Sequence, residues 1–133
     1  MSGDPIRYSA SVRDLFARLP GAQAQALAPG RGTVVSGEAM ALERGAWVRF
    51  EALIDQGRVE ACVFRAWGCP HVLAASAWAC AEMRGLAIDA AGAINARRLA
   101  EALDAPAGKM GRLLVVEDAI HALFAEARAV QLR

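Results

Sequence analysis

Several residue types are scarce in this 133-residue chain, and each scarcity excludes a class of protein. Three cysteines, an odd number without a CxxC pair, argue against a disulfide framework and favour a reducing cytoplasm. A net charge of +1 gives no electrostatic reason to expect nucleic acid as a partner. No 18-residue apolar run is free of charge, and the first residues lack the order of a secretion signal. We therefore expect neither a membrane span nor export.

Small apolar residues, by contrast, are abundant. Hydrophobic residues make up 56% of the chain, although aromatic residues supply only 6%. Alanine, valine and leucine provide most of this fraction, which favours tightly packed helices over a sandwich of aromatic strands. The length suits one domain with its own core, and no repeat or linker divides it. We expect a single domain over residues 1–133.

The first half of the chain predicts one helix followed by three strands. Residues 8–19 have the apolar spacing of an amphipathic helix, and Pro20 ends it. Residues 32–41 predict a strand on weaker evidence. Residues 46–54 alternate between apolar and polar side chains, and residues 58–66 return as a partner strand after a turn at 55–57. We expect an antiparallel sheet.

The second half predicts helices. One begins after Cys69, a short one is N-capped by Asn95, and a long one covers residues 109–128. Within the last helix, residues 113–116 are apolar on every side, so we expect them to be buried. The order of elements indicates an α+β fold, a small three-stranded antiparallel sheet with these helices packed on one face.

Cys69 lies between Gly68 and Pro70, at the predicted start of a helix. Proline is favoured at the first helical position, which makes Cys69 the N-cap. A side chain there faces unpaired backbone N–H groups and the positive end of the helix dipole, and both favour a reactive thiolate. The alternative is that Cys69 is a small residue filling a strand–helix corner. The local pattern alone does not separate the two interpretations.

The remaining candidates for chemistry have simpler explanations. Cys62 falls in the middle of a predicted strand and Cys80 in the middle of a predicted helix, so buried packing explains both. His71 is close enough in sequence to reach a proton or a metal near Cys69. The simpler interpretation is a solvated histidine in the first turn of the helix.

Five segments together resemble the IscU-type iron–sulfur cluster assembly scaffolds, which are similar to the N-terminal domain of NifU. The segments are YSASVRDLFARLP at 8–20, RVEACVFRAWGC at 58–69, AASAW at 74–78 with Gly85 closing its helix, INARRLAEAL at 94–103 and VEDAIHAL at 116–123. Their order and spacing carry the resemblance. It implies the α+β scaffold fold over nearly the whole chain.

The resemblance also implies a ligand set that this chain lacks. Family scaffolds hold a [2Fe–2S] cluster or zinc with three cysteines and an aspartate, and only the middle cysteine has a counterpart, Cys69. The Cys-Gly-Asp turn of the family is here LERG at 42–45, which keeps only Gly45. Where the third cysteine is expected, KMGR at 109–112 places Arg112. The chaperone-recognition loop is reduced to APAGK at 105–109.

One thiolate does not satisfy a zinc ion or a [2Fe–2S] cluster, each of which takes four ligands. We therefore expect no cluster in the isolated monomer. Glu43, His71, Lys109 and Arg112 are the expected surroundings of Cys69. Arg112 has two candidate roles: it stabilises a thiolate or persulfide at Cys69, or it pairs with Glu43 as a salt bridge that replaces the lost metal. We favour the salt bridge.

These observations predict a non-catalytic, scaffold-like protein of iron–sulfur cluster assembly. Cys69 would accept persulfide sulfur from a cysteine desulfurase or help to hold a cluster or metal shared between chains, for example in a homodimer. The alternative is an interaction or regulatory module that keeps the fold without metal binding. An acyl-transfer enzyme using Cys69 and His71 is disfavoured, because residues two apart diverge by ~200° around a helix.

Overall fold

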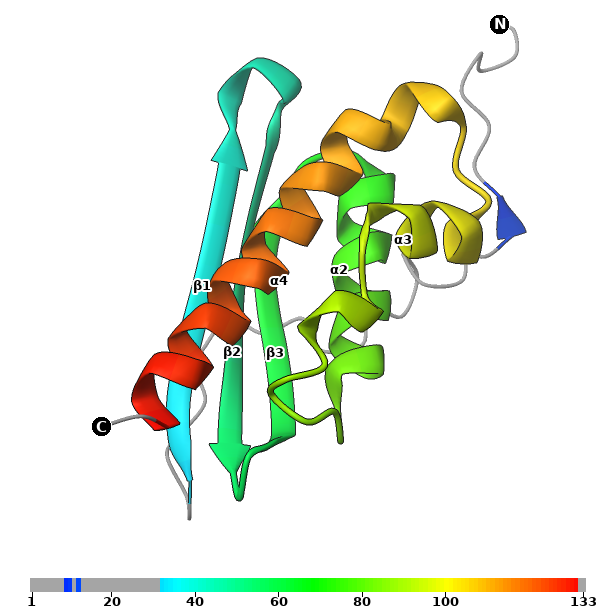
Figure 1. Ribbon diagram of the computed structural model, residues 1–133. Helices are drawn as coiled ribbons and strands as arrows, with labels where there is room; N and C mark the ends of the chain where they lie inside the picture. The colour runs from blue at the N-terminus through cyan, green and yellow to red at the C-terminus, as the bar shows by residue number, and fades with distance from the viewer. Residues whose placement is uncertain (1–8, 11, 13–31, 132–133) are drawn as a thin grey trace, which may run out of the picture.

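The computed structural model describes residues 9–10, 12 and 32–131. Its strands are β1 (Thr33–Ala41), β2 (Ala46–Asp55) and β3 (Arg58–Trp67), and its helices are α2 (Pro70–Met83), α3 (Ala96–Leu103) and α4 (Met110–Gln131). Short 3-10 turns lie at Leu42–Arg44, Ala91–Ala93 and Ala107–Lys109. The strands form one antiparallel sheet in the order β1-β2-β3 (Figure 1). The predicted α+β fold with a three-stranded sheet is confirmed.

The alternation predicted for β2 separates the two faces of the sheet. On one face, Val48, Phe50 and Ala52 are fully buried under the helices. Phe50 lies directly opposite Phe64 of the neighbouring strand β3. The connection to β3 turns through Gln56 and Gly57, which have φ values of 53° and 73°. Two successive residues at positive φ are typical of the tight turns that join hairpin strands. The sequence prediction of this hairpin is confirmed.

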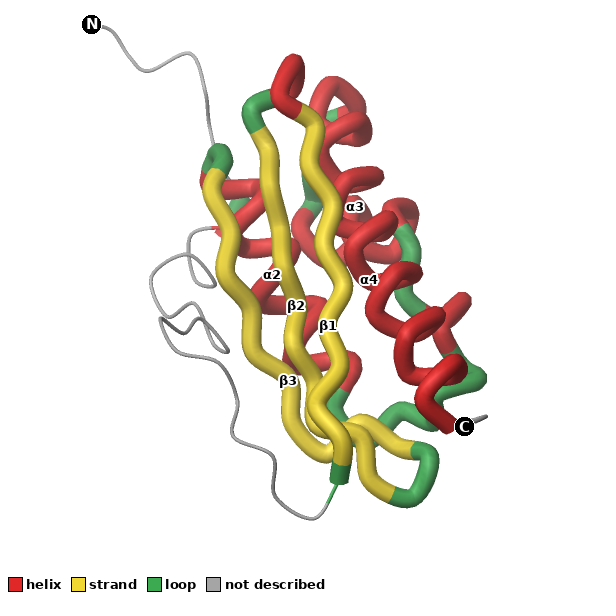
Figure 2. Tube along the Cα trace, turned by 90° about the vertical axis from the view of Figure 1, so that its left-hand side faces the viewer, coloured by secondary structure: helices red, strands yellow, loops and turns green. Residues whose placement is uncertain are grey.

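Helices α2 and α4 cover one face of the sheet, and α2 lies mainly over β3 while α4 lies over β1 and β2 (Figure 2). The prediction that all three helices pack on the sheet is wrong for α3. This eight-residue helix packs mainly on α2 and α4, where its Leu99 and Leu103 are fully buried. Two helices already fill the width of a three-stranded sheet, so α3 forms an outer layer.

Gly37 permits the close contact between α4 and β1. An added Cβ at Gly37 would lie 2.6 Å from the carbonyl oxygen of Ala119 and 2.6 Å from the Cα of Leu123. Both are backbone atoms of α4, so no side-chain rotation would relieve the contact. The backbone of the helix therefore packs directly on the strand at this position.

The expectation that residues 113–116 are all buried is wrong at one position. Leu113 and Val116 are fully buried and Val115 is 6% exposed, but Leu114 is 44% exposed. An α-helix turns about 100° per residue, so four consecutive residues span more than the buried face. Leu114 is the position that faces outward.

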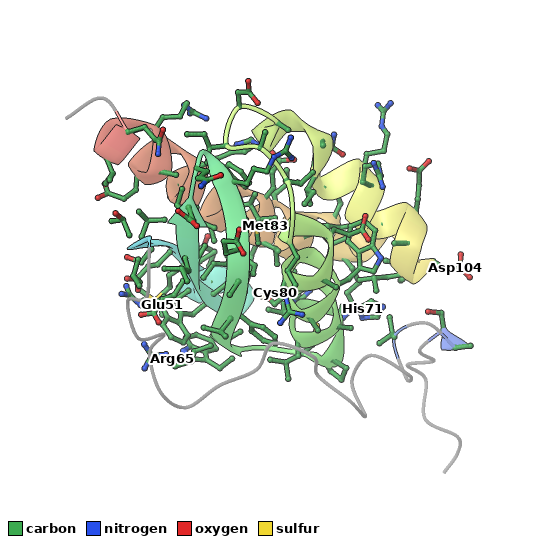
Figure 3. The ribbon with its side chains drawn as sticks, turned by 90° about the horizontal axis from the view of Figure 1, so that it is seen from below. Glu51, Arg65, His71, Cys80, Met83 and Asp104 are labelled. Carbon is green, nitrogen blue, oxygen red and sulfur yellow. The ribbon has the colours of Figure 1, made fainter. Side chains whose placement is uncertain are left out.

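The face of the sheet that points away from α2 and α4 carries a charged network. The carboxylate of Glu51 lies 3.4 Å from the guanidinium of Arg49 and 3.5 Å from that of Arg65 (Figure 3). Arg49 also pairs with Glu38 at 3.4 Å, and the indole of Trp47 donates a hydrogen bond of 2.7 Å to the same carboxylate. Because Arg49 and Arg65 are direct cross-strand neighbours, Glu51 offsets a like-charge pair.

The helix predicted for residues 8–19 lies largely outside the described residues. At its start, the hydroxyl of Ser9 donates to the carbonyl of Leu103, and Val12 is fully buried in the core. No helix within the described ranges is both long enough and apolar enough to cross a membrane.

Candidate functional site

Three segments that are distant in sequence meet at one end of the sheet, the upper end in Figure 1. They are the β1–β2 connection, the turn from β3 into α2, and the start of α4. Gly68, at φ 152°, lies so close to the first segment that an added Cβ would be 3.2 Å from the Gly45 carbonyl oxygen. Gly111 lies directly against the guanidinium of Arg44. The hairpin tip, the turn that holds Cys69 and the start of α4 are therefore neighbours.

Cys69 is the N-cap of α2, as predicted, with φ −73° and ψ 168°, and Pro70 begins the helix. Its carbonyl accepts hydrogen bonds from the Val72 and Leu73 amides at 2.9 and 3.2 Å. Its side chain makes no capping hydrogen bond. The thiol is free and half-buried, whereas Cys62 and Cys80 are only 1% and 2% exposed. Cys69 is therefore the cysteine that reagents and partners can reach.

His71 is buried, and the interpretation of a solvated histidine is wrong. It is 1% exposed and lies on the first turn of α2, well away from the Glu51 network (Figure 3). Burial lowers the pKa of His71 below 6.5, and the positive charges of Lys109 and Arg112 lower it further. The imidazole is therefore neutral at neutral pH. Lys109 and Arg112 therefore lie close enough to the first turn of α2 to act on His71, and their effect on Cys69 stays a prediction.

Arg44, which the sequence pattern did not indicate, occupies the place expected for Glu43. The guanidinium of Arg44 packs on Gly111, while the Glu43 side chain is exposed. Between the described residues Glu43 and Arg112 there is no ion pair, so the favoured salt bridge is wrong. The sequence did offer a reason to consider Arg44, because it directly precedes Gly45, the one residue kept from the family turn. The tie between hairpin and last helix is a packing contact instead.

The described residues around the start of α2 offer positive charge and no set of metal ligands. Across residues 9–10, 12 and 32–131, no three histidine, cysteine, aspartate or glutamate side chains lie close enough to hold a metal. Arg44, Lys109 and Arg112 instead place positive charge around the start of α2 and α4. Cations disfavour a bound metal ion and favour an anionic sulfur group.

A surface pocket of about 410 Å³ lies at the opposite end of the sheet. Its lining comes from the β2–β3 turn, the segment after α2 and the end of α4: Gly57, Ala87, Ile88, Asp89, Arg128 and Gln131. Because Cys69 lies at the other end of β3, this pocket is not part of the Cys69 region.

The sequence pattern described as the NifU-like N terminal domain matches residues 8–131. The chain belongs to this family. The match covers the predicted first helix, the sheet and all three described helices. The family resemblance drawn from the short segments is thus confirmed.

Two curated members of the family show how far the likeness extends in sequence. The iron–sulfur cluster assembly scaffold protein IscU of Haemophilus influenzae is 34% identical over 77 residues, which are 58% of this chain and 61% of that protein. IscU of Escherichia coli K12 is 33% identical over 72 residues, 54% of this chain and 56% of that protein. The matched stretch is therefore less than two-thirds of either relative.

Solved structures support the fold of the family over a larger share of the chain. A protein assigned to iron–sulfur cluster assembly in the SUF system of Fervidobacterium islandicum superposes with a TM-score of 0.67 at 14% identity, covering 88% of this chain and 96% of that one. A NifU-like protein (N-terminal) of Brucella abortus gives 0.57 at 15% identity, with 94% of each chain covered. At these identities the similarity shows the NifU-like fold alone.

Proposed function

We propose that this family member is a non-catalytic, scaffold-like protein that takes up sulfur on Cys69 during iron–sulfur cluster assembly. The observation that carries the proposal is the setting of Cys69, a half-buried free thiol at the N-cap of α2. Lys109 and Arg112 act electrostatically on His71, two residues after Cys69, and the described residues contain no group of three side chains that could hold a metal. Such a site suits an anionic sulfur species in the reducing cytoplasm.

The proposed step is transfer of a sulfane sulfur from a persulfide, supplied by a cysteine desulfurase. The Cys69 thiolate attacks the outer sulfur of the donor persulfide. A bond forms between Cys69 Sγ and that sulfur, the S–S bond of the donor breaks, and the donor cysteine leaves as a thiolate. No electrons are gained or lost overall. The new persulfide is anionic, so the amide groups of the first turn and the nearby cations stabilise it.

A cluster, the cargo of this family, would need ligands from more than one chain. One protomer offers a single suitable thiolate, while a [2Fe–2S] cluster takes four ligands. We propose that any cluster or metal is shared, either between Cys69 residues of a homodimer or with a partner protein. The isolated monomer would then hold none.

The exposed apolar side chains at this end of the molecule suggest where the sulfur donor docks. Among the described residues, the large hydrophobic side chains with substantial exposure are Met40, Leu42, Trp67, Met110 and Leu114. All five belong to the segments that surround Cys69. We call them the apolar rim. Concentrated apolar exposure of this kind marks interaction sites, so we propose that the desulfurase binds the apolar rim.

Sulfur uptake can be measured directly. The reduced protein is incubated with a cysteine desulfurase and cysteine, or with glutathione persulfide, and analysed by intact-mass and peptide mass spectrometry. We expect the mass of one sulfur atom to be added at Cys69, and no addition in Cys69→Ser. Cys80→Ser serves as the matched control and should accept sulfur normally. Sulfur on Cys62 or Cys80, or none on the wild type, would refute the proposal.

A second candidate function is an interaction or regulatory module with the scaffold fold. The lack of a three-residue metal-ligand group in the described part of the chain favours it. The two functions differ in their dependence on Cys69. If the chain binds and modulates a desulfurase equally well as wild type and as Cys69→Ser, the regulatory function is correct.

A further inference from the structure

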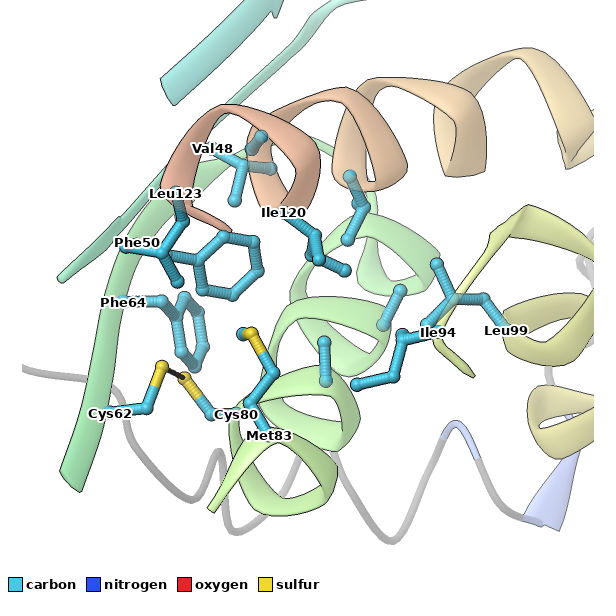
Figure 4. Close-up of a cluster of buried hydrophobic side chains, with 14 of the residues drawn as sticks. Val48, Phe50, Cys62, Phe64, Cys80, Met83, Ile94, Leu99, Ile120 and Leu123 are labelled. Carbon is cyan, nitrogen blue, oxygen red and sulfur yellow. Dashed lines mark hydrogen bonds between the residues drawn. The ribbon is translucent and has the colours of Figure 1, made fainter. Parts of the chain in front are cut away.

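Two thiols that the proposed function does not use lie in contact inside the core. Cys62 on β3 and Cys80 on α2 have their sulfur atoms 3.4 Å apart (Figure 4). Their side chains are 1% and 2% exposed, and Figure 4 shows them beside Phe64 and Met83. Both cysteines are free. The pair is a buried dithiol formed by residues from two different elements.

The fold holds these two thiols together. Cys62 is opposite Ala52 in the sheet, on the face that the helices cover, and α2 packs along β3. Cys80 lies in the third turn of α2, where the buried side of the helix faces the strand. A disulfide needs its sulfur atoms about 2.05 Å apart, so the two atoms must approach by roughly 1.4 Å. Side-chain rotation of the two cysteines can supply a movement of that size.

We propose that Cys62 and Cys80 are a modification site, forming a reversible disulfide that fastens α2 to β3. The oxidant is a small hydroperoxide. It oxidises one thiol to a sulfenic acid, breaking its O–O bond and releasing an alcohol or water. The second thiol then attacks that sulfur, the S–S bond forms, and the sulfenic oxygen leaves as water. Two electrons pass from the two thiols to the peroxide.

The environment of the pair decides which oxidants reach it. The hydrogen bond from Cys62 raises the pKa of the Cys80 thiol, and burial raises it further. The Cys80 thiol therefore stays protonated and reacts slowly, since the thiolate is the nucleophile. Bulky disulfides such as oxidised glutathione do not fit into a closed core. Oxidation by a small peroxide is thus the selective route.

The position of the pair gives the disulfide a structural consequence. Strand β3 runs from Cys62 up to Trp67, and α2 returns from Pro70 down to Cys80. The bond would close the base of this strand–turn–helix unit, which presents Cys69 at its apex. A cross-link of this loop restricts the unfolded chain and so stabilises the folded protein. The inference stands on the Cys62–Cys80 contact and does not need sulfur transfer at Cys69.

The experiment uses the Cys69→Ser protein, in which the pair are the only thiols. Hydrogen peroxide is added to the folded protein, followed by non-reducing peptide mapping and thermal unfolding. We expect a linked Cys62–Cys80 peptide and a Tm raised by roughly 5–10 °C. Dithiothreitol should restore the original Tm in the same sample. A full return would show that peroxide caused no irreversible oxidation elsewhere in the protein.

The matched control is Cys69→Ser with Cys80→Ala, which keeps Cys62 but removes the partner thiol. Peroxide should give it no Tm increase. The proposal is overturned if the linked peptide forms only in denaturant, if peroxide produces sulfinic acid without a cross-link, or if the cross-linked protein unfolds at a lower temperature than the reduced one.

Discussion

Exposure separates Cys69 from the other two cysteines of the chain. Its thiol is half-buried at the N-cap of α2, whereas Cys62 and Cys80 are closed off from an alkylating reagent, which is larger than a peroxide, unless the core opens. We predict that iodoacetamide at neutral pH labels Cys69 first, about tenfold faster or more than the buried pair, because such opening is rare in a stable core. Timed labelling with mass spectrometry measures the three rates. Faster labelling of Cys62 or Cys80 would contradict the account of the helix start.

His71 should make the stability of the protein depend on pH. Its pKa in the folded state is lowered from 6.5 by burial and by Lys109 and Arg112. The unfolded chain therefore binds more protons as the pH falls below 6.5, and folding stability is lost. We predict a free energy of unfolding that is constant with respect to His71 above that pH and declines between 6.5 and the lowered pKa. Urea unfolding at several pH values measures it.

Two variants test whether His71 is the cause. His71→Gln should remove this part of the decline, while His121→Gln, which changes the exposed histidine of α4, should keep it. Lys109→Gln should raise the pKa of His71 towards 6.5, as followed by NMR titration of the ring. If His71 titrates near 6.5 in the wild type, the buried and cationic setting described above is incorrect.

The packing of α4 on β1 depends on the absence of a side chain at residue 37. Gly37→Ala would place a methyl group against the backbone of α4 at Ala119 and Leu123. We predict a loss of about 3 kcal/mol in the free energy of unfolding, the upper range for overpacking, because neither backbone can rotate away. Gly92→Ala is the control, since nothing lies within 4 Å of an added Cβ there. Equal stability of the two variants would show that the helix and strand are farther apart.

Local sequence signals predicted the elements of the fold well. The N-caps Cys69 and Asn95 are where the residue types placed them, and the Asn95 side chain accepts a hydrogen bond of 2.9 Å from the Arg98 amide. The alternation of apolar and polar side chains in β2 predicted which face of the sheet the helices cover. These features depend on neighbouring residues alone, so one sequence is enough to read them.

Features set by the contact of distant elements were not predictable. The Cys62–Cys80 contact depends on how α2 packs along β3, and the Arg44–Gly111 contact depends on the hairpin tip lying beside the start of α4. Burial of His71 likewise requires neighbouring elements to cover the first turn of α2. The pattern of its own strand or helix was enough to predict that Cys62 or Cys80 is buried. The contact between the two could not be predicted in the same way.

At the scale of the whole molecule, the apolar rim should control partner binding. Trp67 is 45% exposed at the end of β3, two residues before Cys69. Truncating an aromatic anchor at the centre of an interface commonly costs 2 kcal/mol or more, so we predict roughly a 30-fold weaker Kd for a desulfurase with Trp67→Ala. The control Glu60→Ala changes an exposed residue at the other end of β3 and should bind normally. Equal binding of both variants would place the interface elsewhere.

The central claim is that Cys69 acts as a single sulfur acceptor among cations, without the companion ligands of a cluster site. Anaerobic reconstitution with iron and sulfide, followed by gel filtration, absorbance and iron counting, tests it most directly. We predict that the monomer retains no cluster, and that any cluster formed is shared between chains and disappears on dilution and in Cys69→Ser. About two irons per monomer that persist on dilution, the content of a complete [2Fe–2S] site, would contradict the account.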